Sequence, residues 1–307
     1  MVTKKNALII ALIFSAIVIT YFAVSVVTLN LALTARASEI QRFPSELGLG
    51  YKDIEFPPRD ENSIRLKGWW IPAEKSKAVV IGVHGLDSNR EHLLELAPAI
   101  NQEGFSLLLF DLRGHGLSDK ARMGAGLEEV KDIQGAIDFA VSNYTSESNK
   151  IFLHGISYGA AAALLAGHQE SDVAGVLSDS AFASLTDLII GEVADRTYLP
   201  LWGAELLRPG LTRSAKIFKG IDLDEVLPAE AAGEYDYPLG LVHCKADQRV
   251  EITHLAQIRA KVQEPPWLVA YTNCEHASAQ YDHREHYVAS ALNYFNSRLE
   301  SLSGIAE

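Results

Sequence analysis

The chain changes its pattern of polar and apolar positions after about residue 77. Residues 51–56 and 64–70 alternate polar and apolar side chains, which is typical of half-buried strands and predicts an antiparallel hairpin or meander. Later segments are instead continuously apolar, as strands covered on both faces are. These segments lie at residues 78–83, 106–110, 151–153, 174–177, 239–242 and 267–271.

Helical segments separate most of the apolar runs. In one of them Val130, Ile133, Ile137 and Val141 recur at the spacing of a buried helical stripe. This alternation predicts an α/β fold with a mostly parallel, twisted sheet and helices on both faces. Residues 182–236 interrupt it with apolar clusters that lack a strand pattern. Because so long an insertion in a compact fold is usually functional, we expect a helical cap over the carboxyl ends of the strands.

The N-terminal segment is apolar enough to cross a membrane. Residues 7–29 carry no charge and, as a helix, would extend about 34 Å. Lys4 and Lys5 precede this span, which predicts a cytoplasmic N-terminus and an extracytoplasmic globular domain. A cleaved signal peptide is the alternative, since Ala35-Arg36-Ala37 resembles a cleavage site, but the apolar run is longer than signal peptides carry. We therefore expect an anchor over residues 1–37 and one globular domain over residues 38–307.

Composition limits the classes of partner. A chain of 307 residues with 48% hydrophobic residues can bury a substantial core. Its formal net charge of −12 argues against nucleic acid, which needs a basic surface. The expected partners are a small-molecule ester or acyl substrate and, through residues 7–29, a membrane.

The pentapeptide Gly155-Ile156-Ser157-Tyr158-Gly159 is the strongest chemical signal. An apolar strand, residues 151–154, leads into it, and an alanine-rich helix starting at Ala160 leaves it. A serine at such a corner is held on a sharp turn with its hydroxyl exposed, and the flanking glycines let other backbone pass close by. This context predicts a nucleophile elbow with Ser157 as the nucleophile.

A serine hydroxyl needs a base and a group that orients the base. In hydrolases with such an elbow the chain order is serine, then an acid, then histidine, each just beyond a strand. Asp247 follows the strand that ends near His243, and His276 follows the strand at residues 267–271. We predict that Ser157, Asp247 and His276 form a catalytic triad.

Other residues compete for these two roles. Asp179 follows the preceding strand and is the rival acid, and Asp247 has the alternative of being an ordinary turn residue. His283 and His286 are the rival bases, but they lie where the last helix begins and fit solvated positions better. The loop directly after the strand favours His276.

The transition state also needs donors for an oxyanion. The loop after the first apolar strand contains His84, Gly85 and Leu86, at a place where such folds supply a backbone N–H. We predict that the N–H groups of Leu86 and Tyr158 form the oxyanion hole, and that His84 braces the turn.

The run Asp111-Leu112-Arg113-Gly114-His115-Gly116-Leu117-Ser118-Asp119, with His84-Gly85 upstream and the Ser157 elbow downstream, resembles the α/β-hydrolase superfamily. Within it, the chain looks like the membrane-anchored serine hydrolases of the Bem46 and monoglyceride-lipase-like group. The resemblance runs from about residue 51 to the C-terminus and is weak across the cap. It implies an α/β-hydrolase fold in which Asp111, Arg113 and His115 stabilise a loop near the site.

The two cysteines, Cys244 and Cys274, lie near the ends of the strands that precede Asp247 and His276. They lack the spacing of a metal site. An extracytoplasmic location would permit a disulfide, but adjacent parallel strands seldom offer suitable geometry. We therefore expect two buried free thiols.

These patterns predict a serine hydrolase that cleaves carboxylic esters or thioesters through an acyl-enzyme, without a metal or organic cofactor. The apolar cap and the membrane span suggest a lipophilic acyl substrate. One alternative is a peptidase or amidase of the same fold. Another is a catalytically silent, membrane-tethered binding or scaffold protein, because a fold does not by itself imply a function.

Overall fold

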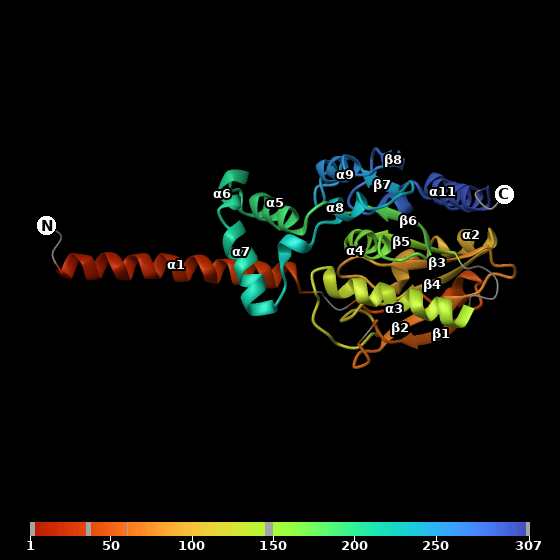
Figure 1. Cartoon of the computed structure of the whole chain (residues 1–307), viewed down its shortest axis with the longest axis horizontal. Helices are drawn as coiled ribbons and strands as arrows, with labels where there is room; N and C mark the ends of the chain where they lie inside the picture. The colour runs from red at the N-terminus through yellow and green to blue at the C-terminus, as the bar shows by residue number, and fades with distance from the viewer. Residues whose placement is uncertain (1–3, 35–37, 60, 145–149, 305–307) are drawn as a thin grey trace. The chain divides into compact units, whose positions relative to one another are not determined.

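The computed structural model describes residues 4–34, 38–59, 61–144 and 150–304 (Figure 1). The chain divides into two compact units. Unit 1 contains Met1–Thr34 and Leu185–Val226, and unit 2 contains Ala35–Ser184 and Leu227–Glu307. The N-terminal helix thus groups with most of the predicted cap segment. The alternative cleavage site at residues 35–37 lies outside the described residues.

Unit 2 is built on an eight-stranded sheet with the strand order β1-β2-β4-β3-β5-β6-β7-β8. The strands that pair antiparallel are β1 with β2 and β2 with β4, whereas all pairs from β4 to β8 are parallel. The predicted change from an antiparallel opening to parallel strands is therefore confirmed. The strands are β1 Lys52–Phe56, β2 Leu66–Ile71, β3 Ala78–Val83, β4 Phe105–Phe110, β5 Ile151–Ile156, β6 Val173–Asp179, β7 Gly240–Cys244 and β8 Trp267–Tyr271.

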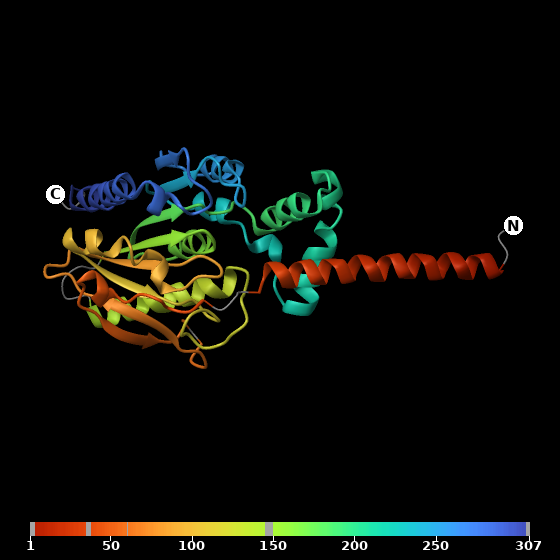
Figure 2. The ribbon, with the colours of Figure 1, turned by 180° about the vertical axis from the view of Figure 1, so that it is seen from behind.

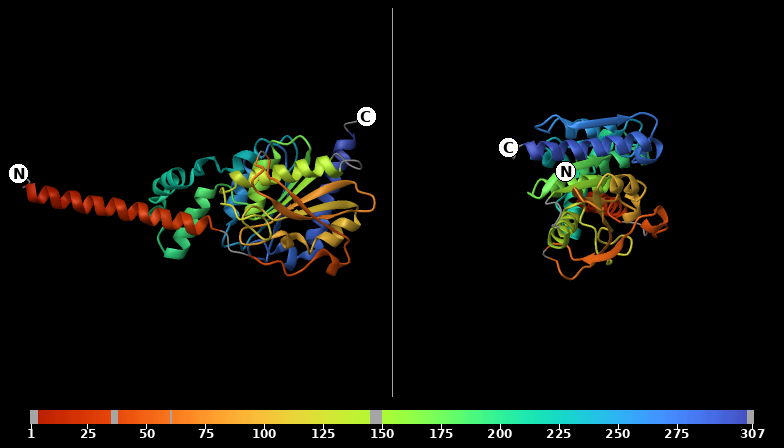
Figure 3. Two further views of the ribbon diagram at one scale, coloured as in Figure 1. Left: turned by 90° about the horizontal axis from the view of Figure 1, so that it is seen from below. Right: turned by 90° about the vertical axis from the view of Figure 1, so that its right-hand side faces the viewer.

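Helices cover both faces of this sheet (Figure 3). Phe152 and Leu153 are neighbours in β5, so their side chains point to opposite faces. The Phe152 ring lies 4.9 Å from the ring of Phe295 in α11, whereas the Leu153 side chain lies close to Gly167 of α4. Helix α2 packs against α11, and α3 packs against α4. The helical segments of unit 2 are η1 Pro44–Leu47, η2 Arg90–Leu93, α2 Ala97–Gln102, α3 Leu127–Tyr144, α4 Tyr158–Gly167, α8 Pro228–Ala232, α9 Ile252–Arg259, α10 Ala279–Asp282 and α11 Arg284–Gly304.

Strand β8 differs from the prediction. It is the last strand at one edge of the sheet, and Trp267 and Leu268 remain 39% and 36% exposed. Its continuous apolar run resembles that of a strand buried on both faces, but an edge position leaves part of such a run uncovered. The α3 stripe agrees better, because Ile133 and Ile137 are fully buried.

Unit 1 is helical, as the lack of a strand pattern between residues 182 and 236 predicts (Figure 2). That this segment covers the carboxyl ends of the strands stays a prediction. Helix α1 has a mean hydropathy of 2.7 and is the one helix among the described residues that is long and apolar enough to cross a membrane. The helical segments of unit 1 are α1 Lys4–Ala32, α5 Leu185–Thr197, α6 Leu201–Glu205, α7 Arg208–Ser214, η3 Ala215–Lys219 and η4 Leu223–Glu225.

A buried polar chain crosses the core of unit 2. The hydroxyl of Tyr287 donates to Asp179 Oδ2 at 3.0 Å and lies 2.9 Å from His154 Nε2. Because this hydroxyl donates to the carboxylate, its oxygen accepts from His154 Nε2. Burial, with a smaller contribution from His92, lowers the pKa of His154 to about 3.

His154 makes the stability of the fold sensitive to acid. Between pH 6.5 and about 3, His154 binds a proton in the unfolded chain but not in the folded one. As the pH falls through this range, the residue therefore lowers the free energy of unfolding by about 1.4 kcal/mol per pH unit. We expect His154→Phe to be less stable than the wild type at pH 7.5, where it loses a hydrogen bond, and to close that gap by pH 5. Denaturant unfolding of the purified chain in detergent at both pH values measures this difference. Parallel pH curves for the two proteins would contradict it.

Candidate active site

Ser157 lies at the corner between β5 and α4 in a strained backbone conformation. Its φ of 56° falls in the left-handed region, which non-glycine residues rarely adopt. A Cβ on Gly155 would lie 2.4 Å from the Gly159 carbonyl oxygen, and one on Gly159 would lie 2.3 Å from that of Val83. Both flanking positions therefore require glycine, and the structure contains the sharp strand-to-helix turn that the pentapeptide predicts.

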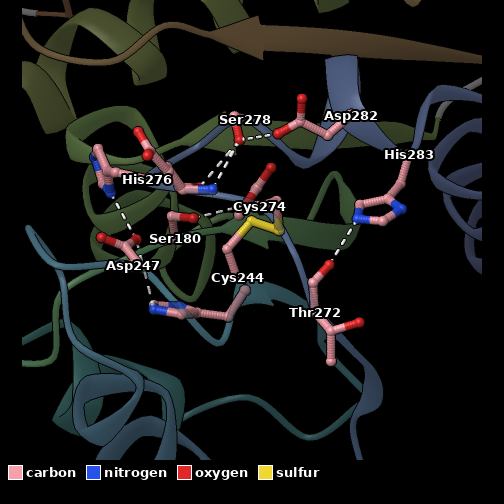
Figure 4. Close-up of a disulfide and its surroundings, with 12 residues drawn as sticks. Ser180, Cys244, Asp247, Thr272, Cys274, His276, Ser278, Asp282 and His283 are labelled. Atoms are coloured by element: carbon pink, nitrogen blue, oxygen red, sulfur yellow. Dashed lines mark hydrogen bonds and ion pairs between the residues drawn. A yellow bond between two sulfur atoms is a disulfide. The ribbon is translucent and has the colours of Figure 1, made fainter.

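The structure brings Ser157 together with His276 and Asp247 in a hydrogen-bonded row. Ser157 Oγ lies 2.7 Å from His276 Nε2. His276 Nδ1 in turn lies 2.7 Å from Asp247 Oδ2 (Figure 4). The other carboxylate oxygen accepts from the backbone N–H groups of Arg249 and Val250 at 2.9 and 2.8 Å. Because a carboxylate only accepts, Nδ1 donates to it, and Nε2 is left to accept from the serine hydroxyl.

The rival residues have other partners. Asp179 is fully buried and accepts hydrogen bonds from Ser180 and Tyr287. Burial raises the pKa of its carboxyl to about 6, although these hydrogen bonds lower it. His283 Nε2 lies 2.8 Å from the Thr272 carbonyl oxygen, and His286 Nδ1 lies 3.0 Å from the Tyr271 hydroxyl. Within the described part of the chain, no group of three or more His, Cys, Asp or Glu residues could hold a metal ion.

The predicted oxyanion donors lie on two segments next to Ser157. Tyr158 is the first residue of α4, where a backbone N–H has no partner within the helix. Leu86 follows Gly85, on which a Cβ would lie 3.3 Å from Ser157 Cβ. The loop with Leu86 therefore passes beside the serine, and the role of both N–H groups stays a prediction.

His84 joins two loops near the site, in agreement with the predicted bracing role. Its Nδ1 lies 2.7 Å from the Gly85 carbonyl oxygen, and its Nε2 accepts from the Leu112 N–H at 3.0 Å. The ring is fully buried, and burial together with His115 lowers its pKa well below the usual value. A neutral His84 thus fixes the loop after β3 to the loop after β4.

Sequence reasoning missed His92, which lies in the short helix η2. Its Nδ1 accepts from the Gly85 N–H at 3.3 Å, directly before the predicted oxyanion donor Leu86. Burial, and to a lesser extent His276, lowers the pKa of His92 to about 4, so the ring stays neutral and able to accept. Neither spacing nor motif marks this residue in the sequence, because the contact depends on how η2 folds back.

The loop after β4 is held by two buried ion pairs. Arg90 binds Asp111 at 2.8 Å, and Arg113 binds Asp132 at 2.7 Å. His115 Nδ1 lies 2.9 Å from the carbonyl oxygen of Arg113. These contacts agree with the loop-stabilising role that the family resemblance implies for Asp111, Arg113 and His115.

Cys244 and Cys274 form a disulfide, so the prediction of free thiols is wrong (Figure 4). The prediction assumed two cysteines within adjacent parallel strands. Cys244 is in register with Tyr271, however, and Cys274 lies three residues later, after a turn in which Asn273 has a φ of 59°. This turn carries Cys274 back to a Cα–Cα distance of 5.4 Å. The bond thereby joins the segments that lead to Asp247 and His276.

Solved structures share this architecture. The chain resembles the Pyrococcus furiosus esterase Pf2001 with a TM-score of 0.70 and 21% identity, covering 86% of this chain and 97% of that one. It resembles the α/β hydrolase GrgF from Penicillium sp. sh18 with a TM-score of 0.60 and 19% identity, covering 82% of this chain and 99% of that one. At such identities the likeness establishes the fold.

Sequence relatives agree with this fold. Residues 74–212 match the family described as serine aminopeptidase, S33. The chain is 28% identical to the uncharacterized protein YfhR of Escherichia coli O157:H7 over 81% of each chain. Together with the fold, these matches support the α/β-hydrolase superfamily. The narrower Bem46 and monoglyceride-lipase-like group stays a prediction.

The disulfide should stabilise the two loops that carry Asp247 and His276. It closes a loop with a sequence separation of 30, for which the chain-entropy treatment gives about 3–4 kcal/mol of stability. We expect the double variant Cys244→Ser, Cys274→Ser to lose free energy of unfolding of that order, with faster amide exchange at residues 245–250 and 272–278. Denaturant unfolding and hydrogen exchange measure both effects, and chemically reduced wild type is the matched control. Unchanged protection of these residues would contradict the expectation.

Proposed function

We propose that this α/β hydrolase is a serine hydrolase that cleaves carboxylic ester or thioester bonds. The observation that carries the proposal is the hydrogen-bonded row Ser157, His276 and Asp247 at a strained elbow. A nucleophile, a base within hydrogen-bond distance and an orienting acid are what nucleophilic acyl transfer requires.

In the proposed mechanism, His276 Nε2 takes the proton of Ser157 as Oγ attacks the substrate carbonyl carbon. Asp247, held by two backbone N–H groups, keeps the imidazole in the correct tautomer and stabilises its positive charge. The N–H groups of Leu86 and Tyr158 would bind the oxyanion. Protonated His276 then gives its proton to the leaving alcohol or thiol, and a water activated by the same histidine cleaves the acyl-enzyme.

The resemblance to the esterase Pf2001 supports an ester substrate. The apolar character of α1 and of the cap segment supports a lipophilic acyl chain. A second candidate, a peptidase or amidase, is supported by the match to the family described as serine aminopeptidase. The two candidates share the same nucleophile and differ in the leaving group.

We also propose that α1 anchors the protein in a membrane with the N-terminus in the cytoplasm. Lys4 and Lys5 precede an uncharged apolar helix, which favours this orientation. It would place unit 2 outside the cytoplasm. The Cys244–Cys274 disulfide is consistent with that side, because disulfides persist mainly in oxidising compartments.

Labelling with a fluorophosphonate probe tests the nucleophile. We expect the wild type to react covalently and Ser157→Ala not to react, because the probe needs an activated serine. Asp247→Asn should lower the rate of ester hydrolysis by about 10⁴-fold, since it removes the acceptor that sets the tautomer of His276.

Asp179→Asn is the matched control for the acid, because Asp179 is also buried at a strand end and does not bond to His276. It should retain activity within about tenfold. An absence of labelling in folded wild type would favour a catalytically silent binding or scaffold protein. Equal losses for Asp179→Asn and Asp247→Asn would contradict the assigned acid.

The acyl preference separates the remaining candidates. We expect kcat/KM to rise along a series of p-nitrophenyl esters from short to mid-length acyl chains, because added methylenes gain apolar contacts of about 0.8 kcal/mol each when buried. Steady-state rates on this series, with aminoacyl amides of the same acyl groups in parallel, measure both preferences. Cleavage of short esters alone would overturn the lipophilic assignment, and faster turnover of amides would favour the peptidase.

A further inference from the structure

Unit 1 exposes an unusual number of large apolar side chains outside the membrane-spanning helix. We call these the cap apolar residues: Tyr198, Leu199, Leu201, Trp202, Leu206, Ile217 and Phe218. Tyr198 is 95% exposed, Trp202 71% and Phe218 64%. Single apolar residues are common on soluble surfaces, but seven large ones within 21 consecutive positions of one small unit indicate an interaction surface.

The same segment is basic, in contrast to the chain as a whole. Residues 201–219 contain four basic residues, Arg208, Arg213, Lys216 and Lys219, and one acid, Glu205, whereas the full chain has a formal net charge of −12. Two of these cations are ion-paired within unit 1, Arg208 with Asp187 and Glu205, and Lys216 with Asp222. Lys216 and Lys219 directly flank Ile217 and Phe218 along the sequence. Aromatic residues beside lysines are typical of segments at a membrane interface, where the apolar groups enter the lipid and the amines reach the headgroups.

Helix α7 packs closely on α1 within unit 1 (Figure 2). A Cβ on Gly210 would lie 2.2 Å from Ser25 Oγ and 2.8 Å from the ring of Tyr21, so glycine is required at this crossing. The Tyr21 hydroxyl accepts from the Gly210 N–H at 2.8 Å and donates to the Leu206 carbonyl oxygen at 2.8 Å. Close approach through small residues and full pairing of backbone polar groups are what packing in or near lipid requires.

This packing sets the depth of the cap helices if α1 crosses a bilayer. A hydrocarbon core of about 30 Å takes about 20 helical residues, so of the apolar residues 7–29 the first 20 end at Val26 and the remainder extend toward the headgroups. Tyr21 and Ser25 then lie in the last turns of the span. The segment that contains Leu206 and Gly210 is bonded to these turns and must lie at the boundary between lipid and water, where Tyr and Trp are enriched.

We propose that the cap apolar residues insert into the interfacial layer of the membrane that α1 crosses. This proposal rests on the proposed membrane anchor and adds a second, peripheral contact with the lipid. The occupant of the exposed surface is thus a bilayer, since α1 delivers α6, α7 and η3 to its boundary. If the bilayer did not cover the cap apolar residues, a protein partner would have to bind at the membrane boundary to cover them.

Spin labels on the full chain in phosphatidylcholine and phosphatidylglycerol vesicles test the proposal. Cys244 and Cys274 are bonded to each other, so a single introduced cysteine takes the label specifically. The four sites are Trp202→Cys and Phe218→Cys in the cap, Phe14→Cys in α1, and Leu117→Cys as a control that is 63% exposed in unit 2. For each label we compare the collision rate with oxygen, which dissolves in lipid, to that with a water-soluble nickel complex. We expect this ratio to be several-fold higher for the labels at 202 and 218 than for the label at 117.

The label at position 14 separates the two proposals. If it is accessible to the nickel complex, the membrane anchor itself is wrong. If it lies in lipid while the labels at 202 and 218 behave like the one at 117, only the cap proposal is overturned. Labels at 202 and 218 that are screened from both reagents would indicate a covering protein, which also overturns it.

Quenching by brominated lipids provides a second measurement without introduced cysteines. Trp69 and Trp70 are buried in unit 2 and Trp267 is 39% exposed, so Trp202 at 71% is the most exposed of the four tryptophans. We expect lipids with bromine on the upper acyl chain to quench the tryptophan fluorescence of the wild type measurably. The fluorescence of Trp202→Phe should be quenched clearly less. Equal fractional quenching of the two proteins would contradict insertion.

Discussion

The backbone of Ser157 is the constraint on which the site depends. A left-handed conformation at a serine is unfavourable, and it persists because the surrounding chain leaves no alternative. The Ser157 N–H donates to the Asp179 carbonyl oxygen at 2.7 Å, and glycines on both sides let β3 and α4 approach. The sheet therefore holds the hydroxyl in one direction, where it lies 2.7 Å from His276 Nε2.

The groups around this corner are neutral histidines and paired charges. His84 and His154 are buried and His92 is partly buried, and burial is the main reason that the pKa values of all three rings fall. Arg90 and Arg113 pair with carboxylates below the same loops. Such groups are costly to bury, and the ion pairs and the hydrogen bonds of His84 offset this cost. The consequence is that the loops after β3 and β4 are fixed to each other beside Ser157.

Much of this arrangement follows from local sequence patterns. The strands, the parallel sheet and the residues Ser157, Asp247 and His276 were predictable because short-range signals and chain order determine where each lies relative to a strand end. The exposure of β8 was not predictable in this way, because an edge position depends on the strand order of the whole sheet. Two further contacts were not predicted, the one between His92 and Gly85 and the Cys244–Cys274 bond. Both arise from loops that fold back over a few residues. The grouping of α1 with Leu185–Val226 joins segments that no local pattern connects.

That grouping has a consequence for the order of folding. The hydrogen bond from Tyr21 to Leu206 spans 185 positions of the sequence, so α1 is synthesised long before its partner. During synthesis the first six strands of the sheet emerge between the two halves of unit 1. Unit 1 can close only after most of unit 2 is made, which makes its docking a late step with a large loop-closure cost. A chain interrupted within unit 2 would leave Tyr21, Ser25 and their surroundings on α1 without the helix that covers them.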